Sequence, residues 1–214
     1  MDASYVDLAD ATHLEFDYMR WLRIVLRVAN ANRVLHVGGG GCSLARALTA
    51  EAPNGLQEVC EFDSDVLSLA REHLGLRRTP GLRVRHAEGR SHIAAQRDDS
   101  WDAIVIDAFI GARVPARLID AEALLDAARV APMTLVNIVD NRAAGDVAAA
   151  SVAMAAAYPT VWTLGRLPGN TIVAGCDAGL QLDLDRVATA AAADVSPARL
   201  VPRPQSVDHT DRFR

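Results

Sequence analysis

Residues 33–63 read RVLHVGGGGCSLARALTAEAPNGLQEVCEFD, and this stretch decides the fold. It begins with an apolar strand-like run, continues into four glycines and a segment with helical spacing, and ends in a second apolar run with acidic residues. Glycines let the backbone approach a ligand closely, and a carboxylate about 20 residues further on can bind ribose hydroxyls. The stretch therefore predicts the first half of a nucleotide-type binding unit.

Runs rich in valine and isoleucine alternate with helix-like segments along the rest of the chain. The expected strands are residues 33–37, 57–62, 82–86, 102–107, 133–139, 160–164 and 170–176. The expected helices are residues 17–29, 43–50, 64–74, 91–96, 117–130, 143–157 and 184–193. This alternation predicts an α/β fold with a seven-stranded, mainly parallel, Rossmann-like sheet.

The two ends of the chain depart from this alternation. The short turn GRLPGN, with Pro168 and Gly169, predicts that the last two strands form a C-terminal antiparallel hairpin. Residues 5–7 and 13–16 are expected to form a short N-terminal strand pair, and the proline- and arginine-rich residues 195–214 to be mobile. We therefore expect an N-terminal segment (1–30), a nucleoside-binding α/β domain (31–177), and a C-terminal helix and tail (178–214).

Composition narrows the class of protein. Half of the 214 residues are hydrophobic and the net charge is −5, with basic residues scattered, so neither nucleic acid nor a membrane is expected as a partner. The N-terminus lacks the basic and apolar regions of a secretory signal, which predicts a cytoplasmic location. The three cysteines, Cys42, Cys60 and Cys176, have no metal-ligand spacing and are interpreted as reduced thiols.

Two other glycine-loop functions fit the residues less well. The dinucleotide motif G-x-G-x-x-G/A, started at Gly38, would need glycine or alanine at Ser43, which disfavours NAD and FAD. Residues 41–45 also match a nucleophile elbow, G-x-S-x-A, but His209 is the only histidine after Asp107 that could complete a hydrolase triad.

Acidic residues lie at or just beyond the ends of three of the expected strands. Glu61 is expected to bind the ribose, with Asp63 capping the next helix. Glu88 either accepts a hydrogen bond from an adenine amino group or simply begins a helix. Asp107, flanked by apolar residues, is a candidate general base.

Support for further site residues is weaker. Asn137, Asp140 and Asn141 follow the fifth strand and could line the same edge of the sheet. His86 and Glu88 form an H-x-E, but the P-C-x-x-C of a zinc deaminase does not follow. The histidines share no ligand spacing, so no metal is expected.

The chain resembles the spermidine synthase (aminopropyltransferase) family, which has the class I methyltransferase-like fold. The resemblance extends from about Tyr5 to Cys176 and is carried by LEFDYM, VLHVGGGGC, CEFDSDVLSLAREHL, LRVRHAEGR, WDAIVIDAF and LPGNTIVAGC. CEFDSDV is the most specific of these segments, because it closely matches the acidic ribose-binding segment of the family.

This resemblance implies roles for individual residues. The cofactor-binding residues would be Gly38, Gly39, Gly40, Glu61, Phe62, Glu88 and Gly89. Asp107 would be the catalytic base, and Tyr18 and Asp107 would contact the amine substrate. The resemblance further implies S-adenosylmethionine or its decarboxylated form as group donor, a place in polyamine biosynthesis, no metal, and a small-molecule acceptor, most simply an amine.

The chain departs from the family pattern where the amine binds. Gly41 and Ile110 replace aspartates, Met19 replaces a glutamine or histidine, and Arg166 replaces a tyrosine. Burying a diamine requires paired carboxylates, so putrescine is a doubtful acceptor. A methyltransferase and a nucleoside-binding protein without catalysis are the alternatives, and the oligomeric state, including a homodimer, is left open.

Overall fold

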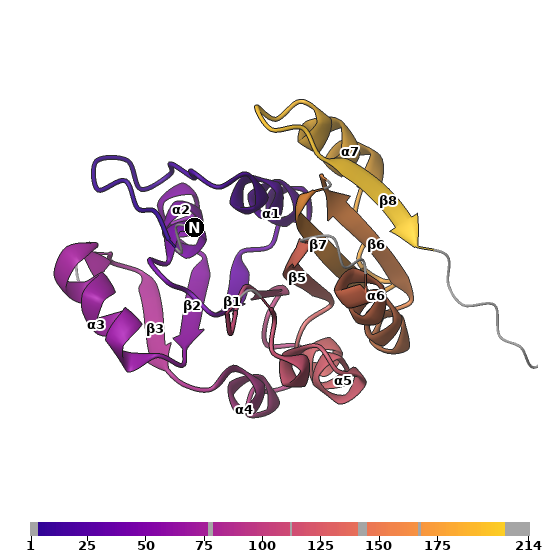
Figure 1. Cartoon of the computed structure of the whole chain (residues 1–214), viewed down its shortest axis with the longest axis horizontal. Coiled ribbons are helices and arrows are strands. Elements are labelled where there is room, and N and C mark those ends of the chain that lie inside the picture. The colour runs from indigo at the N-terminus through magenta and orange to yellow at the C-terminus, as the bar shows by residue number, and fades with distance from the viewer. Residues whose placement is uncertain (1–3, 77–78, 112, 141–144, 167, 204–214) are drawn as a thin grey trace, which may run out of the picture.

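The computed structural model describes residues 4–76, 79–111, 113–140, 145–166 and 168–203. Its centre is a single sheet of eight strands in the order β3-β2-β1-β4-β5-β7-β6-β8 (Figure 1). The first five strands pair in parallel, and β7, β6 and β8 join them antiparallel. The sheet confirms the predicted α/β class, with one strand more than expected.

The strands are short and mostly buried. They are β1 (Arg33–Val37), β2 (Leu56–Glu61), β3 (Leu82–His86), β4 (Ala103–Ile106), β5 (Met133–Asp140), β6 (Thr160–Gly165), β7 (Gly169–Cys176) and β8 (Arg199–Arg203). In the central strands almost every residue is apolar, because parallel strands covered on both faces have no solvated side.

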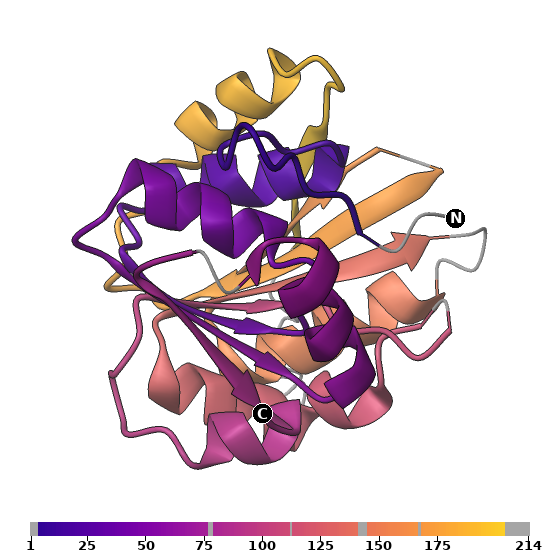
Figure 2. The same ribbon diagram turned by 90° about the vertical axis from the view of Figure 1, so that its left-hand side faces the viewer.

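Helices cover both faces of the sheet (Figures 1 and 2). They are α1 (Asp17–Val28), α2 (Ser43–Glu51), α3 (Ser64–His73), α4 (Gly89–Ala94), α5 (Ala121–Val130), α6 (Gly145–Ala157) and α7 (Leu184–Ala192). α1, α2 and α7 pack on one face, and α4, α5 and α6 pack on the other. α3 packs beside α2 through a smaller apolar cluster.

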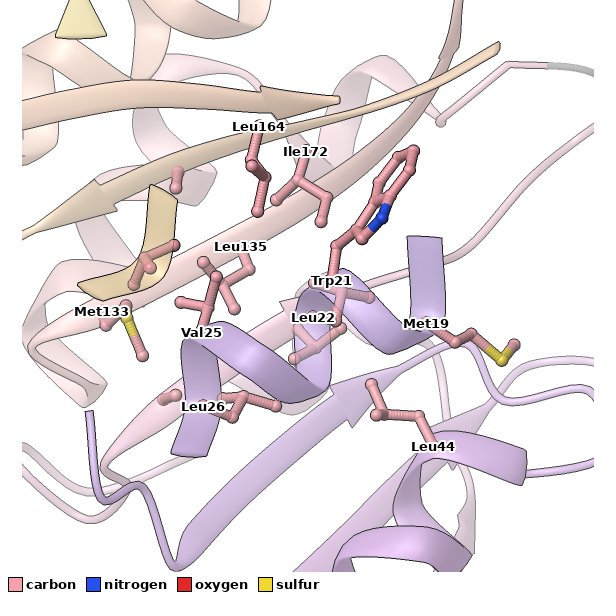
Figure 3. Packing of buried hydrophobic residues seen from close by; sticks show 14 of the residues in the cluster. Met19, Trp21, Leu22, Val25, Leu26, Leu44, Met133, Leu135, Leu164 and Ile172 are labelled. Atoms are coloured by element: carbon pink, nitrogen blue, oxygen red, sulfur yellow. The ribbon is translucent and has the colours of Figure 1, made fainter. Parts of the chain in front are cut away.

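The N-terminal helix, α1, packs against the sheet through the buried apolar side chains on one of its faces. Trp21, Leu22 and Val25 of α1 project toward Leu135 of β5 and Ile172 of β7 (Figure 3). All five side chains are at most 1% exposed. Apolar burial is the main driving force for this packing, and it sets the position of the first residues of α1 next to the sheet edge where ligands bind in such folds.

The predicted N-terminal strand pair is wrong. The side chains of Asp7 and Asp10 accept hydrogen bonds from the backbone of Ala9 and Thr12, both at 2.8 Å. Asp side chains that bind the backbone two residues on form turns and compete with strand pairing. Residues 5–7 and 13–16 accordingly contain no strand.

The expectation for the tail is also wrong in part. Arg199–Arg203 forms β8 along β6, with Leu200 opposite Leu164 and Val201 opposite Thr163. Two apolar residues opposite a buried strand stabilise this pairing despite Pro202. Residues 204–214 lie outside the described part of the chain.

Two helix starts differ from the expected ones because of side-chain caps. Glu88 caps α4, which therefore begins at Gly89 rather than at residue 91. Asp120 caps α5 at Ala121, and a short 3₁₀ turn, η2 (Ala116–Leu118), precedes it. Both carboxylates accept hydrogen bonds from the first-turn N–H groups, which otherwise have no partner.

No helix within the described ranges is both long enough and apolar enough to cross a membrane.

Candidate functional site

A cleft of about 570 Å³ lies at the carboxyl ends of β1, β2, β3 and β4. Its walls combine residues that the sequence singled out: Gly38, Gly39, Gly40, Glu61, Phe62, Glu88, Gly89 and Asp107. The volume is within the usual range for small-molecule sites, and the carboxyl edge of a parallel sheet is where such sites form.

The glycine loop is held close to the neighbouring strands. A Cβ atom on Gly38 would lie 2.4 Å from the carbonyl oxygen of Asp107, and a Cβ on Gly39 would lie 2.5 Å from Val59 Cγ1. Gly38 also has φ +81°, which side chains disfavour. Glycine is therefore required here for the loop to pass between β2 and β4.

Glu61 connects the glycine loop to the end of β2 by hydrogen bonds. Its Oε2 accepts hydrogen bonds from the N–H groups of Gly39 at 3.0 Å and Gly40 at 3.3 Å, and its Oε1 accepts from Asp63 N at 3.0 Å. Asp63 in turn caps α3, as predicted. A carboxylate has about four lone-pair directions, so one direction on Oε1 stays available to a ligand.

The carboxylate of Glu88 has more hydrogen-bond and ion-pair partners than that of Glu61. Its carboxylate accepts from the backbone N–H groups of Arg90 and Ser91 and from the Ser91 hydroxyl, and Arg117 Nε lies 3.3 Å from Oε1. Burial alone would raise the pKa of Glu88, but these hydrogen bonds and the guanidinium lower it overall. The helix-capping alternative is thus present in the structure, and the adenine contact stays a prediction.

Phe62 and Gly89 contribute the apolar and the close-packed parts of the cleft. Phe62 is 65% exposed, and Leu69 and Ile110 are also exposed in the same cleft. A Cβ on Gly89 would lie 2.4 Å from Val37 Cγ1, so only glycine lets α4 begin against β1. An exposed apolar rim of this kind suits a flat, weakly polar group such as a nucleobase.

Asp107 and Tyr18 meet although 89 residues separate them. The Tyr18 hydroxyl donates to Asp107 Oδ2 at 3.1 Å, and Asn137 Nδ2 donates to Oδ1 at 2.8 Å. The carboxylate is thus held from the start of α1 on one side and from β5 on the other.

Burial raises the pKa of Asp107, while the hydrogen bonds from Asn137 and Tyr18 act in the opposite direction. The pKa of Tyr18 is raised, first by burial and then by the neighbouring Asp107. Tyr18 therefore stays a neutral donor, and Asp107 is an acid whose proton affinity is increased, which suits a general base.

The structure explains the glycine at position 41. A Cβ there would lie 2.6 Å from both Ser4 Oγ and Val6 Cγ2. Ser4 Oγ accepts a hydrogen bond from Gly41 N at 2.8 Å, and the Ser43 hydroxyl donates to the Tyr5 carbonyl oxygen. The N-terminal segment 4–6 thus occupies the space that a side chain at position 41 would need.

The other three departures from the family pattern also lie near Asp107 and Tyr18. Met19 is 6% exposed and borders a small cavity with Asp107. Ile110 is 70% exposed at the mouth of the cleft. Arg166 Nη2 lies 3.7 Å from Asp17 Oδ2, next to Tyr18.

Of the more weakly supported residues, Asn137 is brought to Asp107 by a hydrogen bond. Asp140 is the last residue of β5, and Asn141 lies outside the described residues. Asn170 and Ser4 were missed. The β5–β7 register brings Asn170 to Asn137, and Ser4 reaches the glycine loop by packing, so no local motif could have indicated either.

Within the part of the chain that the structure describes, no three His, Cys, Asp or Glu side chains are grouped so as to hold a metal ion. Cys42, Cys60 and Cys176 are buried and free, in agreement with their interpretation as reduced thiols.

Comparison of the amino-acid sequence with those of known proteins identifies a relative. No protein-family model matches the chain. A polyamine aminopropyltransferase from Vibrio vulnificus (strain CMCP6) is 29% identical over 114 residues, which are 52% of this chain and 38% of that protein. The match therefore spans well under half of the relative's length.

Solved structures match over more of the chain. A probable spermidine synthase from Corynebacterium glutamicum ATCC 13032 has a TM-score of 0.79 at 24% identity, covering 90% of this chain and 76% of that one. A spermidine synthase in complex with the transition state analogue AdoDATO has 0.67 at 19%, covering 80% and 64%. Human methyltransferase-like protein 13 in complex with SAH has 0.66 at 18%, covering 92% and 98%.

At these identities the structural likeness establishes the fold. The chain has the class I methyltransferase-like fold and is similar to the polyamine aminopropyltransferases, or spermidine synthases, as its sequence predicted.

Proposed function

We propose that the chain is a transferase of the spermidine synthase type, which moves an alkyl group from an adenosyl sulfonium donor to an amine. The observation that carries this proposal is the position of Asp107, held by Tyr18 and Asn137 at the edge of the cleft that Glu61 and the glycine loop form. A base next to a nucleoside-sized site is the minimum that such a transfer requires.

The nucleoside half of the cleft suits an adenosyl group. The free lone-pair direction of Glu61 would accept a ribose hydroxyl, and the long contact to Gly40 at 3.3 Å could be exchanged for a second one. Phe62 would cover the base, and Glu88 would reach its amino group if Arg117, which is half-exposed, moved aside. Two structures of the same fold were solved with AdoDATO and SAH, which are adenosyl compounds.

When bound, the donor supplies a carbon attached to a sulfonium, which is already a good leaving group. Asp107 would accept a proton from the acceptor amine, whose solution pKa is about 10 and which must be deprotonated to attack. Tyr18 and Asn137 would keep the carboxylate oriented toward that proton. The new C–N bond forms as the C–S bond breaks, and the electron pair stays on sulfur as a neutral thioether.

Methyl transfer is the second candidate, and Gly41 favours it. Ser4 and Val6 leave no room for an acid at position 41, so an aminopropyl ammonium has no carboxylate partner there. An unpaired buried charge costs several kcal/mol. Intact S-adenosylmethionine carries its own carboxylate beside its ammonium and loses less by the absence of that acid.

The acceptor half of the site points to an amine with few charges. Ile110 and Met19 offer apolar surface where a diamine would need acids, and Arg166 adds a positive charge beside Asp17. We therefore expect putrescine to be a poor substrate and a monoamine with an apolar body to be a better one. Cytoplasmic location and a part in polyamine metabolism stay predictions.

Calorimetric titration with S-adenosylmethionine, its decarboxylated form, methylthioadenosine and NAD tests the donor site. Mass spectrometry of incubations with a panel of amines then identifies the product. An aminopropylated amine supports the first candidate and a methylated one the second, with Asp107→Asn as the inactive control. Tight adenosyl binding without any product would indicate a nucleoside-binding protein, and selective NAD binding would refute the donor assignment.

A further inference from the structure

The hydrogen bonds around Asp107 continue beyond the groups that touch it. Asn137 donates to Asp107 Oδ1 through Nδ2 at 2.8 Å, while its own Oδ1 accepts from Asn170 Nδ2 at 2.9 Å. Asn137 is 0% exposed, so neither end of its amide can turn to solvent. The two contacts together determine which end of the amide faces the carboxylate.

Strand register brings the two asparagines together. In the antiparallel β5–β7 pair, Asn137 is opposite Ile172 and Val139 is opposite Asn170. Asn170 precedes Ile172 by two residues, so it projects from the same face of the sheet as Asn137, as a diagonal neighbour. Such neighbours are within reach of long side chains, and the 2.9 Å contact shows that these two meet.

The backbone at Asn170 is closely packed against β6. A Cβ on Gly165 would lie 2.6 Å from the Asn170 carbonyl oxygen, so the two arms of the β6–β7 hairpin approach each other closely there. Gly169, with φ +143°, makes the turn into β7 immediately before it.

We propose that Asn170 is a positioning residue for the base, acting through Asn137. By donating to Asn137 Oδ1, Asn170 keeps Asn137 Nδ2 directed at Asp107. The inference rests on the proposed function, because it needs Asp107 to serve as the base.

Loss of the Asn170 donor has a defined consequence. Asn137 Oδ1 then has no partner that holds it away from Asp107, so the amide can rotate when Asp107 is protonated and accept the carboxyl proton through Oδ1. This additional hydrogen bond stabilises the protonated form of Asp107 relative to the ionised one. Replacing a donor by an acceptor in this way should raise the pKa of Asp107 by about one unit, and the acid limb of the kcat–pH profile should move by the same amount.

The test is a double-mutant cycle read by ¹³C NMR of the aspartate side-chain carboxyl carbons in the protein without ligand. Asn170→Leu removes the donor without adding charge, and Asn170→Asp is close in shape but cannot donate when ionised. Each is compared with wild type and again in an Asn137→Leu background. Thr163→Val, a polar-to-apolar change in neighbouring β6, is the matched control and should leave the Asp107 titration unchanged.

If Asn170 acts through Asn137, Asn170→Leu raises the pKa of Asp107 by about one unit when Asn137 is present and by less than roughly 0.3 unit when it is Leu. Asn170→Asp should raise the pKa of Asp107 further, because it also adds a negative charge. In the Asn137→Leu background, only the increase in pKa that this charge causes should remain. No shift in the presence of Asn137, or equal shifts in both backgrounds, overturns the proposal.

The NMR readout does not depend on turnover, so the two proposals can fail separately. One outcome is that the double-mutant cycle shows Asn170 acting through Asn137 on the pKa of Asp107 while the wild-type protein transfers no alkyl group. That result would refute the proposed function and keep the link between Asn170 and Asp107. An active wild type whose kcat–pH profile does not respond to Asn170→Leu would refute the positioning role and keep the function.

Discussion

The backbone N–H of Gly41 donates to Ser4 Oγ at 2.8 Å, and the same oxygen would lie 2.6 Å from a Cβ atom on that glycine. The N-terminal segment and the glycine loop are thus complementary in shape and in hydrogen bonding. A carboxylate could return to position 41 only if the side chains of Ser4 and Val6 moved away.

We therefore expect Gly41→Asp to destabilise the protein rather than to improve diamine use. Overpacking costs about 1–3 kcal/mol, which corresponds to a fall in Tm of about 2–12 °C for a chain of this size. Calorimetry measures the change, with Gly179→Asp as control because a Cβ there meets nothing within 4 Å. An unchanged Tm together with efficient use of putrescine would contradict the interpretation of this contact.

Glu61→Ala should weaken methylthioadenosine binding at least tenfold. The substitution removes the ribose partner and also releases the N–H groups of Gly39, Gly40 and Asp63, and hydrogen bonds to charged groups contribute about 1.5–3 kcal/mol. Isothermal titration measures Kd, with Glu72→Ala on the exposed side of α3 as control. Normal affinity in Glu61→Ala would exclude Glu61 from the binding site.

Asp107→Asn should abolish transfer and raise Tm at neutral pH. Because burial raises the pKa of Asp107, the folded state binds this proton more tightly than the unfolded chain. The contribution of Asp107 to stability is therefore complete below the unfolded pKa of about 3.9 and is lost as pH rises through the folded pKa. The amide carries no such penalty and can still accept from Asn137.

The measurement is a Tm series for both proteins between about pH 4.5 and pH 8, since the other ionisable groups cancel in the difference. The advantage of the Asp107→Asn variant over wild type should shrink as the pH falls. A difference in Tm that is constant over this range would show that Asp107 has the same pKa in the folded and unfolded states.

The buried thiols should be unreactive in the folded protein. Burial raises the pKa of Cys42 and of Cys60 to about 12, so almost no thiolate exists at pH 8. With Cys60 and Cys176 replaced by serine, a charged disulfide reagent should label Cys42 only when the glycine loop opens. Methylthioadenosine should slow this labelling, whereas fast labelling unaffected by ligand would indicate an open loop.

Much of the fold was predictable from residues that act locally. Strands β1 to β7 lie within one or two residues of the expected ranges, because apolar residues recur in each of them and, in the central strands β1 and β4, are buried on both faces. α4 begins two residues before the predicted start, because Glu88, for which a helix start was one of two alternatives, caps the helix with its side chain. Strand β8 was not predicted, because its apolar pair, Leu200 and Val201, lies among arginines and next to Pro202, a composition typical of loops.

The candidate site was predictable only where a motif carries it. Glu61 and the glycine loop belong to one βαβ unit, so their proximity follows from local spacing. The family resemblance alone assigned Tyr18 and Asp107 to the amine site, and no spacing rule that joins α1 to β4 could have predicted the hydrogen bond between them. The contact of Asn170 with Asn137 depends on the register of two strands that pair only in the folded sheet, and no pattern in the sequence determines that register.

The outermost strand also affects how molecules of this protein meet. β8 covers the edge of β6, and it brings Arg199, Arg203 and Pro202 to the new border of the sheet. Charged residues and a proline at a border strand discourage another chain from extending the ladder of hydrogen bonds. This short strand thus serves as protection against aggregation, and its removal should leave a protein that precipitates more readily.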